Sequence, residues 1–289
     1  MIDGKIGILF ATTAMLSWGV ADFLAKKAIN IIGFERSMMM NLLASFAPIL
    51  IYAILFPEMP AISVELVLLV LVTAVFSAFG YFYFYKALEK GTVSVVSPIS
   101  SSWAVVTTSL ATVFFKEALT PYQVAGIILV FVGIFLSSTN LTEMRRSISH
   151  RMSDGASEAI VAMIGWGITF ALAKPLVNIA GPGMTLLFMR AGSFLFVFSW
   201  IKITRVKLTI PEKSIALLLI GSGLLDTVGF LAYNLGVTTQ FVSIVSPIAA
   251  TFPAVTITLA YVFLKERVVN SQKAGIVAIL SGLILISLV

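Results

Sequence analysis

Residues 93–99 read Val-Ser-Val-Val-Ser-Pro-Ile, and residues 242–248 read Val-Ser-Ile-Val-Ser-Pro-Ile. These two stretches belong to a longer match at a shift of 149, in which Gly80 to Leu136 and Gly229 to Leu285 are identical at 21 of 57 gap-free positions. Two apolar segments resemble each other by composition alone, but shared Pro, Lys-Glu and Gln residues at one offset indicate a duplication. The chain therefore contains two copies of one unit.

The composition around these repeats is typical of a membrane protein. Of 289 residues, 59% are hydrophobic and 11% are charged, with a mean hydropathy of +1.06, whereas soluble proteins have about 25% charged residues. A helix that crosses a bilayer needs about 20 apolar residues. Runs of that kind predict ten spans, at Ile6–Ala28, Ser37–Phe56, Leu66–Leu88, Val93–Phe115, Tyr122–Ser137, Ala159–Leu176, Met184–Lys202, Ser214–Gly236, Phe241–Leu264 and Gln272–Val289.

Five of these spans fall in each half of the chain. We expect a first five-helix repeat at residues 1–140, a linker rich in Ser, Thr and charge at 141–155, and a second repeat at 156–289. Because five is an odd number, the two copies must have opposite orientations in the membrane. The expected fold class is an all-α membrane protein with ten transmembrane helices in two inverted repeats, which is the architecture of many secondary transporters.

Basic residues are divided unevenly between the two sides of this predicted bundle. Fifteen of the 19 lie in loops on one side, three lie on the other, and Arg190 lies inside a span. The positive-inside rule then places both termini outside the cell. The net charge of +6 is explained by this topology, so we expect a multi-pass protein of the cell membrane whose nearest partner is the lipid bilayer, and no nucleic-acid partner.

Short motifs recur in the same order in both halves. They are Trp18-Gly19 and Trp166-Gly167, Arg36 and Arg190, Pro98 and Pro247 with Pro253, Lys116-Glu117 and Lys265-Glu266, and Gln123 to Gly126 and Gln272 to Gly275. With these motifs, essentially the whole chain resembles the EamA-type transporters of the drug/metabolite transporter superfamily. The resemblance implies transport, commonly export, of amino acids or other small metabolites, with drugs, nucleotide sugars or sugar phosphates as alternative substrates. It also implies cytoplasmic termini, the opposite of the charge bias.

Ionisable side chains inside spans are costly unless they face a partner or water, so each is a candidate site residue. Asp226 could bind a substrate ammonium or a proton, or it could pair with Arg190 for structural reasons. Its counterpart in the first half is the uncharged Ser77, and this asymmetry favours a functional role. Arg190 could hold a substrate carboxylate, although its position favours snorkelling to the interface. We expect Asp22 to form an i,i+4 ion pair with Lys26 at the membrane edge.

Aromatic side chains are further candidates for the wall of a cavity near the midplane. These candidates are Trp18, Trp166, Tyr233, Tyr81 and Tyr85. The two tryptophans lie mid-helix, away from the interfacial belts where Trp is usual, which favours a cavity wall slightly over core packing. Tyr233 lies on the helical face of Asp226. The other two tyrosines, four residues apart, either present their hydroxyls to the cavity or pack between helices.

Prolines inside two predicted spans indicate kinks. Pro98, Pro247 and Pro253 each remove a backbone hydrogen bond and leave a carbonyl free. Ser97 and Ser246 lie beside them and could satisfy or extend this polar patch, so we include both serines as candidate substrate contacts. The prolines are candidates for gating, with a packing kink as the alternative.

Other function classes receive less support from the residues. The single His, His150, lies in the predicted linker and no His-Glu-x-x-His motif occurs, so the sequence predicts no metal site, no cofactor and no enzyme activity. A channel, scaffold or receptor stays an alternative. The sequence favours a secondary transporter of small polar metabolites such as amino acids, proton-coupled through Asp226, for which a monomer would suffice.

Overall fold

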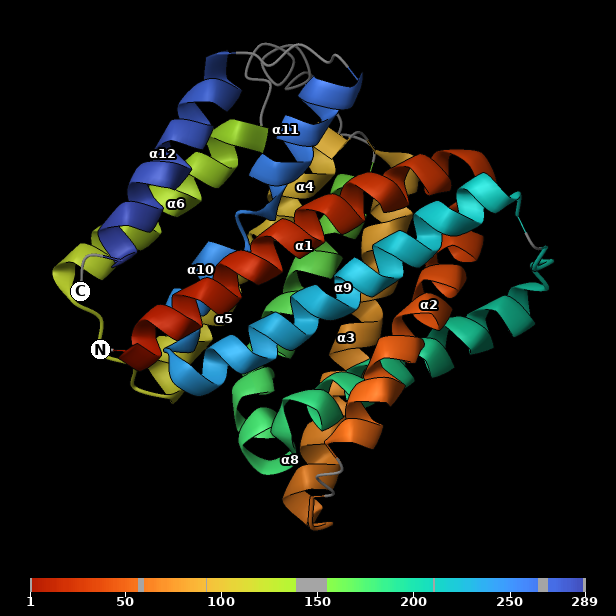
Figure 1. Ribbon diagram of the computed structural model, residues 1–289, viewed down its shortest axis with the longest axis horizontal. Coiled ribbons are helices and arrows are strands. Elements are labelled where there is room, and N and C mark those ends of the chain that lie inside the picture. The colour runs from red at the N-terminus through yellow and green to blue at the C-terminus, as the bar shows by residue number, and fades with distance from the viewer. Residues whose placement is uncertain are drawn as a thin grey trace.

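The computed structural model of the protein describes residues 2–56, 60–91, 93–138, 155–209, 211–264 and 270–287. All regular secondary structure within these ranges is helical, which confirms the expected all-α class. The helices (Figure 1) are α1 (Ile2–Ile32), α2 (Phe34–Leu55), α3 (Val64–Lys90), α4 (Val93–Ser101), α5 (Trp103–Phe114), α6 (Pro121–Ser138), α8 (Ala156–Thr204), α9 (Lys213–Thr239), α10 (Val242–Ala249), α11 (Phe252–Leu264) and α12 (Asn270–Ser287). The predicted linker, 141–155, lies outside the described residues except for Gly155.

The described helices have the length and surface of membrane spans. Five of them, α1, α2, α3, α8 and α9, are long and apolar enough to cross a bilayer, and the others include shorter apolar helices. Large apolar side chains such as Leu9, Ile54 and Leu195 point outward and are more than 60% exposed. Such a surface is unfavourable in water but matches hydrocarbon.

Two predicted spans are separated by a kink and not by a loop. The spans predicted at Ala159–Leu176 and Met184–Lys202 are both parts of α8, which has 49 residues. A straight helix of that length would measure about 74 Å, more than twice the thickness of a bilayer core. The element instead bends at Gly181, whose φ of 76° is left-handed and favours glycine, directly before Pro182. Hydropathy therefore located the two apolar segments, which the kink at Gly181 separates.

Two other predicted spans are interrupted. Val93–Phe115 consists of α4 and α5, which meet at Ser102, and Phe241–Leu264 consists of α10 and α11, which meet at residues 250–251. At both junctions the backbone changes to i→i+3 hydrogen bonds, for example from Ser102 N to Ile99 O at 3.3 Å. The kinks expected from the prolines are therefore present as breaks. Hydropathy could not separate the broken halves, because a break changes backbone angles and not polarity.

Contacts between the two halves recur with the halves exchanged. Helix α1 packs along α9, as Figure 1 shows, and α3 packs along α8. The matching contacts are Thr107 Oγ1 to Gly167 O and Thr256 Oγ1 to Gly19 O, and the packing of Trp166 on Gly80 and of Trp18 on Gly229. Within each half, Lys26 Nζ to Leu88 O in the first corresponds to Lys174 Nζ to Val237 O in the second. Each pair of positions differs by 148 or 149 residues, as the sequence repeat does. The two lysines tie helix ends together.

Helices α6 and α12 lie side by side at one end of the bundle (Figure 1) and meet through glycines. A Cβ atom added at Gly282 would lie 2.7 Å from Gly126 O, and one added at Gly126 would lie 2.8 Å from Gly282 O. Gly133 similarly approaches Gly275 O. These positions need glycine, because only glycine leaves room for backbone on backbone.

We predict that Gly282→Ala lowers the free energy of unfolding in detergent by about 1–3 kcal/mol, because the added methyl group overlaps backbone that cannot move away. Gly221→Ala is the matched control. A Cβ there meets only Leu24 Cδ1, at 3.4 Å, and alanine has the higher helix propensity. Thermal unfolding of the purified variants measures both, and equal midpoints for the two variants would contradict the packing argument.

Candidate functional site

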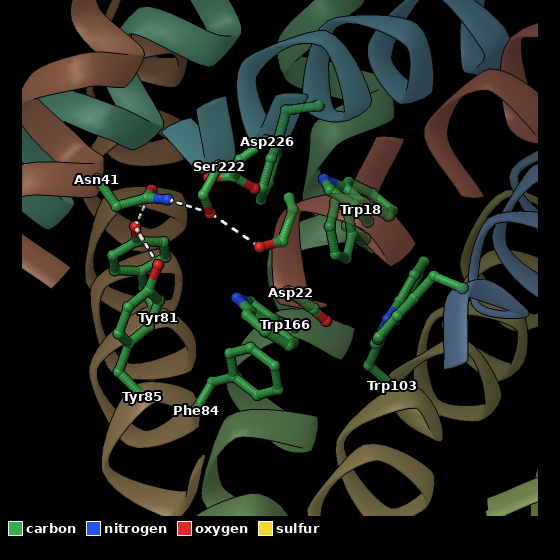
Figure 2. Close-up of a pocket in the computed structure, with 14 residues that line it drawn as sticks. Trp18, Asp22, Asn41, Tyr81, Phe84, Tyr85, Trp103, Trp166, Ser222 and Asp226 are labelled. Atoms are coloured by element: carbon green, nitrogen blue, oxygen red, sulfur yellow. Dashed lines mark hydrogen bonds between the residues drawn. The ribbon is translucent and has the colours of Figure 1, made fainter. Parts of the chain in front are cut away.

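A cavity lies in the centre of the bundle, between α1, α2, α3, α5, α8, α9 and α11. Its volume of about 30 Å³ is room for about two water molecules. The lining residues are Trp18, Ala21, Asp22, Asn41, Tyr81, Phe84, Tyr85, Trp103, Trp166, Phe170, Ser222, Asp226, Phe230 and Phe252 (Figure 2). Both halves of the chain contribute to this wall, and five of the predicted site residues, Trp18, Trp166, Asp226, Tyr81 and Tyr85, are among them.

The two repeat-related tryptophans form opposite parts of the wall. Trp18 is 6% exposed and Trp166 is 8% exposed, and each ring rests on a glycine of the other half. A Cβ atom added at Gly229 would lie 2.5 Å from Trp18 Nε1, and one added at Gly80 would lie 2.3 Å from Trp166 Cδ1. Among the described residues, neither indole N–H has a hydrogen-bond acceptor. Two tryptophans of the cavity wall therefore have buried N–H donors without a partner, and each N–H edge lies against the glycine on which its ring packs.

Further aromatic rings enclose the cavity. Trp103 stacks at a tilt on Phe170 with ring centroids 4.2 Å apart, and Phe84 lies 4.7 Å from Trp166. Phe230 lies 5.1 Å from Trp18 in an edge-on arrangement. The faces and edges of these rings give the wall a mostly apolar surface with a negative potential over each ring face.

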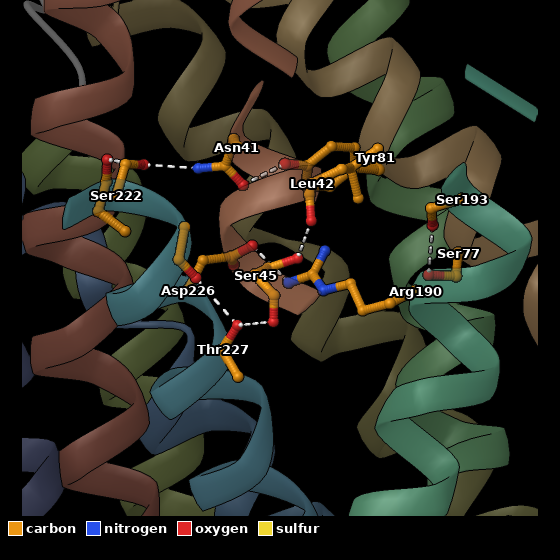
Figure 3. Close-up of polar contacts among 12 residues, drawn as sticks. Asn41, Leu42, Ser45, Ser77, Tyr81, Arg190, Ser193, Ser222, Asp226 and Thr227 are labelled. Atoms are coloured by element: carbon orange, nitrogen blue, oxygen red, sulfur yellow. Dashed lines mark hydrogen bonds and ion pairs between the residues drawn. The ribbon is translucent and has the colours of Figure 1, made fainter. Parts of the chain in front are cut away.

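A buried ion pair lies beside the cavity. Arg190 on α8 donates from Nη2 to Asp226 Oδ2 on α9 (Figure 3). Its side chain is 2% exposed, and that of Asp226 is 13% exposed. The guanidinium carbon also lies 4.4 Å from the ring centroid of Phe230 and 5.2 Å from that of Tyr81. The predicted snorkelling of Arg190 is therefore wrong, and the alternative pairing with Asp226 is present. The guanidinium is held inside the bundle by a carboxylate and two rings, while its Nε has no acceptor among the described residues.

A chain of polar groups runs from the tyrosines to the opposite wall. The Tyr81 hydroxyl donates to Asn41 Oδ1, and the Tyr85 hydroxyl lies 3.4 Å from that of Tyr81. Asn41 Nδ2 donates to Ser222 Oγ at 2.8 Å, and Ser222 Oγ donates to Ala21 O at 2.9 Å (Figure 2). Four helices are thereby joined through the cavity wall, which holds the tyrosine hydroxyls in place.

Asp22 lies in the cavity wall and does not form the ion pair that its spacing from Lys26 predicted. The expected ion pair with Lys26 is absent, because Lys26 Nζ donates to the carbonyl of Leu88 instead. Asp22 is partly buried in the cavity wall and has no hydrogen-bond or ion-pair partner among the described residues. The nearby charge that acts on it is the like charge of Asp226. Asp22 is four residues from Trp18, so the two side chains lie on one helical face. This spacing could have placed Asp22 in the cavity wall from the sequence.

Three predicted site residues lie away from the cavity wall. The Tyr233 hydroxyl lies 2.8 Å from Ser246 Oγ, and the Tyr233 ring packs 4.6 Å from Phe170. Both residues are fully buried, so they support the aromatic wall from behind. Ser97 is also buried and does not reach the cavity. Asn41 and Ser222, which do reach it, carried no motif and became visible only through helix packing.

The predicted gating prolines lie near the helix breaks. Pro247 is buried in α10, three residues before the junction with α11, and Pro253 is buried in the first turn of α11. In the first turn a missing N–H costs no helical hydrogen bond. The side chain of Pro98 lies outside the described residues. Trp103 and Phe252, which follow the two breaks at equivalent positions, both line the cavity.

Comparisons with known proteins match the whole chain. The model of the EamA-like transporter family matches residues 5–139 and 155–288. The uncharacterized transporter YxxF of Bacillus subtilis is 29% identical over 237 residues, which cover 76% of this chain and 69% of that protein. An uncharacterized protein of Methanocaldococcus jannaschii is 29% identical over 147 residues, which cover 45% of this chain and 95% of that protein.

The crystal structure of another protein shows a similar fold. It superposes with a TM-score of 0.77 over 98% of this chain and 96% of its own, at 14% sequence identity. At that identity the likeness extends to the helix arrangement alone.

We predict that Arg190→Met lowers the free energy of unfolding by about 3–5 kcal/mol, because it leaves the Asp226 carboxylate without its counter-ion in apolar surroundings. Arg190→Met combined with Asp226→Leu should recover most of that loss. Lys90→Met is the control, since it breaks a pair with Glu158 in which the lysine is 48% exposed, which should cost about 0–1 kcal/mol. Equal losses for Arg190→Met and Lys90→Met, read from unfolding in detergent, would refute this account.

Proposed function

Because the chain belongs to the EamA-like transporter family and is therefore a multi-pass membrane transporter of the drug/metabolite type, we propose that it is a secondary transporter of small polar metabolites such as amino acids. The proposed direction is export, as the family resemblance implies. The observation that carries the proposal is the central cavity, in which two carboxylates and two unpaired indole N–H groups lie inside an apolar bundle. Buried polar groups without partners are costly unless a ligand or water meets them.

The lining favours amine-bearing metabolites over the alternative substrates of related transporters. Nucleotide sugars and sugar phosphates need Arg or Lys for their phosphates. Among the described residues, the cavity wall has two carboxylates and no basic side chain, and the adjacent Arg190 is occupied by Asp226. A scaffold or receptor that only packs helices has no use for a central cavity with free donors.

We further propose that the two halves are inverted repeats that carry ten spans. The contacts that recur with the halves exchanged support a two-fold relation, since a symmetry of this kind repeats each contact once. The relative from Methanocaldococcus jannaschii, which matches 45% of this chain over nearly its own full length, supports one half as a unit. Rocking of one half against the other would then open the cavity to each side in turn and widen it from its present volume of about 30 Å³ to admit a metabolite.

Gating contacts are proposed where the halves meet at the end of the bundle. Glu117, in the loop after α5, accepts hydrogen bonds from Val242 N at 3.0 Å and from Ser243 N at 2.9 Å, the first residues of α10. A carboxylate at a helix N-terminus is favoured by the helix dipole. Lys116 has a φ of 52°, a left-handed conformation that a side-chain-bearing residue seldom adopts. The equivalent Glu266 lies outside the described residues. We infer that this cap closes one side and breaks when the broken helix α10–α11 moves.

Proton coupling is proposed for Asp22 in place of Asp226. Asp226 has its charge matched by Arg190, whereas Asp22 has no partner and faces the like charge of Asp226. A carboxylate in that position is stabilised either by a proton or by a cationic group of the substrate. Because a proton and a cationic substrate group compete for the same Asp22 carboxylate, binding of one would drive release of the other.

We predict that Asp22→Asn abolishes proton-driven accumulation in proteoliposomes while the variant still folds, because the amide neither binds nor releases a proton. Counterflow of substrate without a proton gradient should lose its pH dependence. Glu212→Gln, which replaces an exposed carboxylate at the start of α9, is the control and should transport normally. A pH profile for Asp22→Asn that matches the unaltered protein would remove the proton role.

The inverted arrangement has its own test, because the chain contains no cysteine. Lys90→Cys and Thr238→Cys place single thiols at the C-terminal ends of α3 and α9, which are equivalent helices of the two halves. In intact cells, we expect a membrane-impermeant maleimide to label one of these thiols and not the other, whereas both react after permeabilisation. Labelling of both from the same side would exclude inverted repeats. The labelled position also assigns the outer face.

A further inference from the structure

We propose that the cavity selects organic amines with a net positive charge, which bind through an ammonium group at Asp22 inside the aromatic wall. This inference rests on the proposed transport function and names its substrate class. It distinguishes a cationic amine from the zwitterionic amino acid that carries the same amine beside a carboxylate.

The charges at the cavity favour a cation. Asp22 and Asp226 are the charged side chains of the wall among the described residues, and Arg190 is the one counter-ion beside them. The other titratable groups that face Asp22 are the hydroxyls of Tyr81 and Tyr85, which are neutral donors. With both carboxylates ionised the site therefore has a net charge of −1. A ligand with one positive charge would bring the net charge of the site to zero. Its attraction to the site is strong, because little water is present to screen the charges.

The aromatic wall is suited to the same ligand. Alkylammonium groups bind against the faces of Trp, Tyr and Phe, most strongly where water is excluded. The protein already holds one organic cation in this way, since the Arg190 guanidinium lies over Phe230 and Tyr81. Trp18, Trp103 and Phe84 provide further rings around the space next to Asp22 (Figure 2). A substrate ammonium would meet the same surroundings as that guanidinium.

The two free indole donors limit what else the ligand carries. Trp18 Nε1 and Trp166 Nε1 have no acceptor and are covered by Gly229 and Gly80 in this state. If the halves move apart at these contacts, a hydroxyl, ether or carbonyl oxygen near the ammonium would satisfy one of them. A substrate carboxylate could accept the same hydrogen bonds. However, it would add a third anion to a site with two aspartates and one arginine, and like charges in low-dielectric surroundings repel strongly.

The repeat shows that the aromatic frame is common to both halves and that the acids are not. At the repeat offsets, Trp18 corresponds to Trp166, Tyr81 to Phe230 and Trp103 to Phe252, and all six line the cavity. Asp22 instead corresponds to Phe170, and Asp226 corresponds to Ser77. The rings are thus common to both halves while the carboxylates lie only on the side of α1 and α9. This asymmetry gives a bound amine one orientation.

Binding of matched ligand pairs tests the inference with the purified full-length protein in detergent. Tyramine and tyrosine, and ethanolamine and serine, differ only by the carboxylate. Three of the four tryptophans, Trp18, Trp103 and Trp166, line the cavity, so quenching of intrinsic fluorescence reports occupancy. We expect each amine to bind at least about tenfold more tightly than its amino acid, which is about 1.4 kcal/mol.

Two variants assign the effect to Asp22. Asp22→Asn should weaken amine binding by about tenfold or more and reduce the preference between the members of each pair, whereas Asp22→Glu, which retains the carboxylate, should preserve the preference. Glu212→Gln should bind like the unaltered protein. If the amino acids bind and are transported as well as the amines or better, the inference is wrong and the proposed transport function stands. If neither class binds nor crosses proteoliposomes, both are wrong.

Discussion

The interaction between Arg190 and Asp226 constrains the centre of this protein. A guanidinium and a carboxylate in an apolar bundle must satisfy each other, because hydrocarbon offers neither charge nor hydrogen bonds. Their pairing joins α8 to α9, and the rings of Tyr81 and Phe230 cover the guanidinium. It also neutralises one of the two acids in the cavity wall. The chemistry of the site then depends on the acid that is left over, Asp22.

Duplication explains both the regularity of the frame and the irregularity of the site. Trp18 on Gly229 and Trp166 on Gly80 are equivalent contacts, so close packing needs the same residues in both halves. The polar positions differ between the halves: where one has Asp226, the other has Ser77, which lies 3.3 Å from Ser193 Oγ (Figure 3). A symmetric frame with an asymmetric lining can move as two similar bodies and still bind a ligand in one orientation.

Much of the fold could be predicted from local patterns, because apolar run length is itself the requirement for spanning a bilayer. The ends of α1, α2, α3, α6 and α9 lie within a few residues of the predicted spans, and the glycine contacts of α6 with α12 follow from small residues at equivalent positions. Prolines indicated kinks in two spans, but the positions of the breaks at Ser102 and at residues 250–251 were not predicted. They depend on backbone angles at single residues, and hydropathy carries no information about those angles.

The amino-acid sequence was sufficient for the membrane class, the duplication, and the position of Trp18, Trp166 and Asp226 inside spans. These follow from apolar run length, from matching residues at one offset, and from the scarcity of charge within the spans. Tertiary structure alone decided which side chains meet. Lys26 is spaced to pair with Asp22, yet it reaches the carbonyl of Leu88 on α3, and Tyr233 turns from the cavity to Ser246. A side chain bonds to the partner that packing brings nearest, and helices far apart in sequence supply partners that local spacing does not contain.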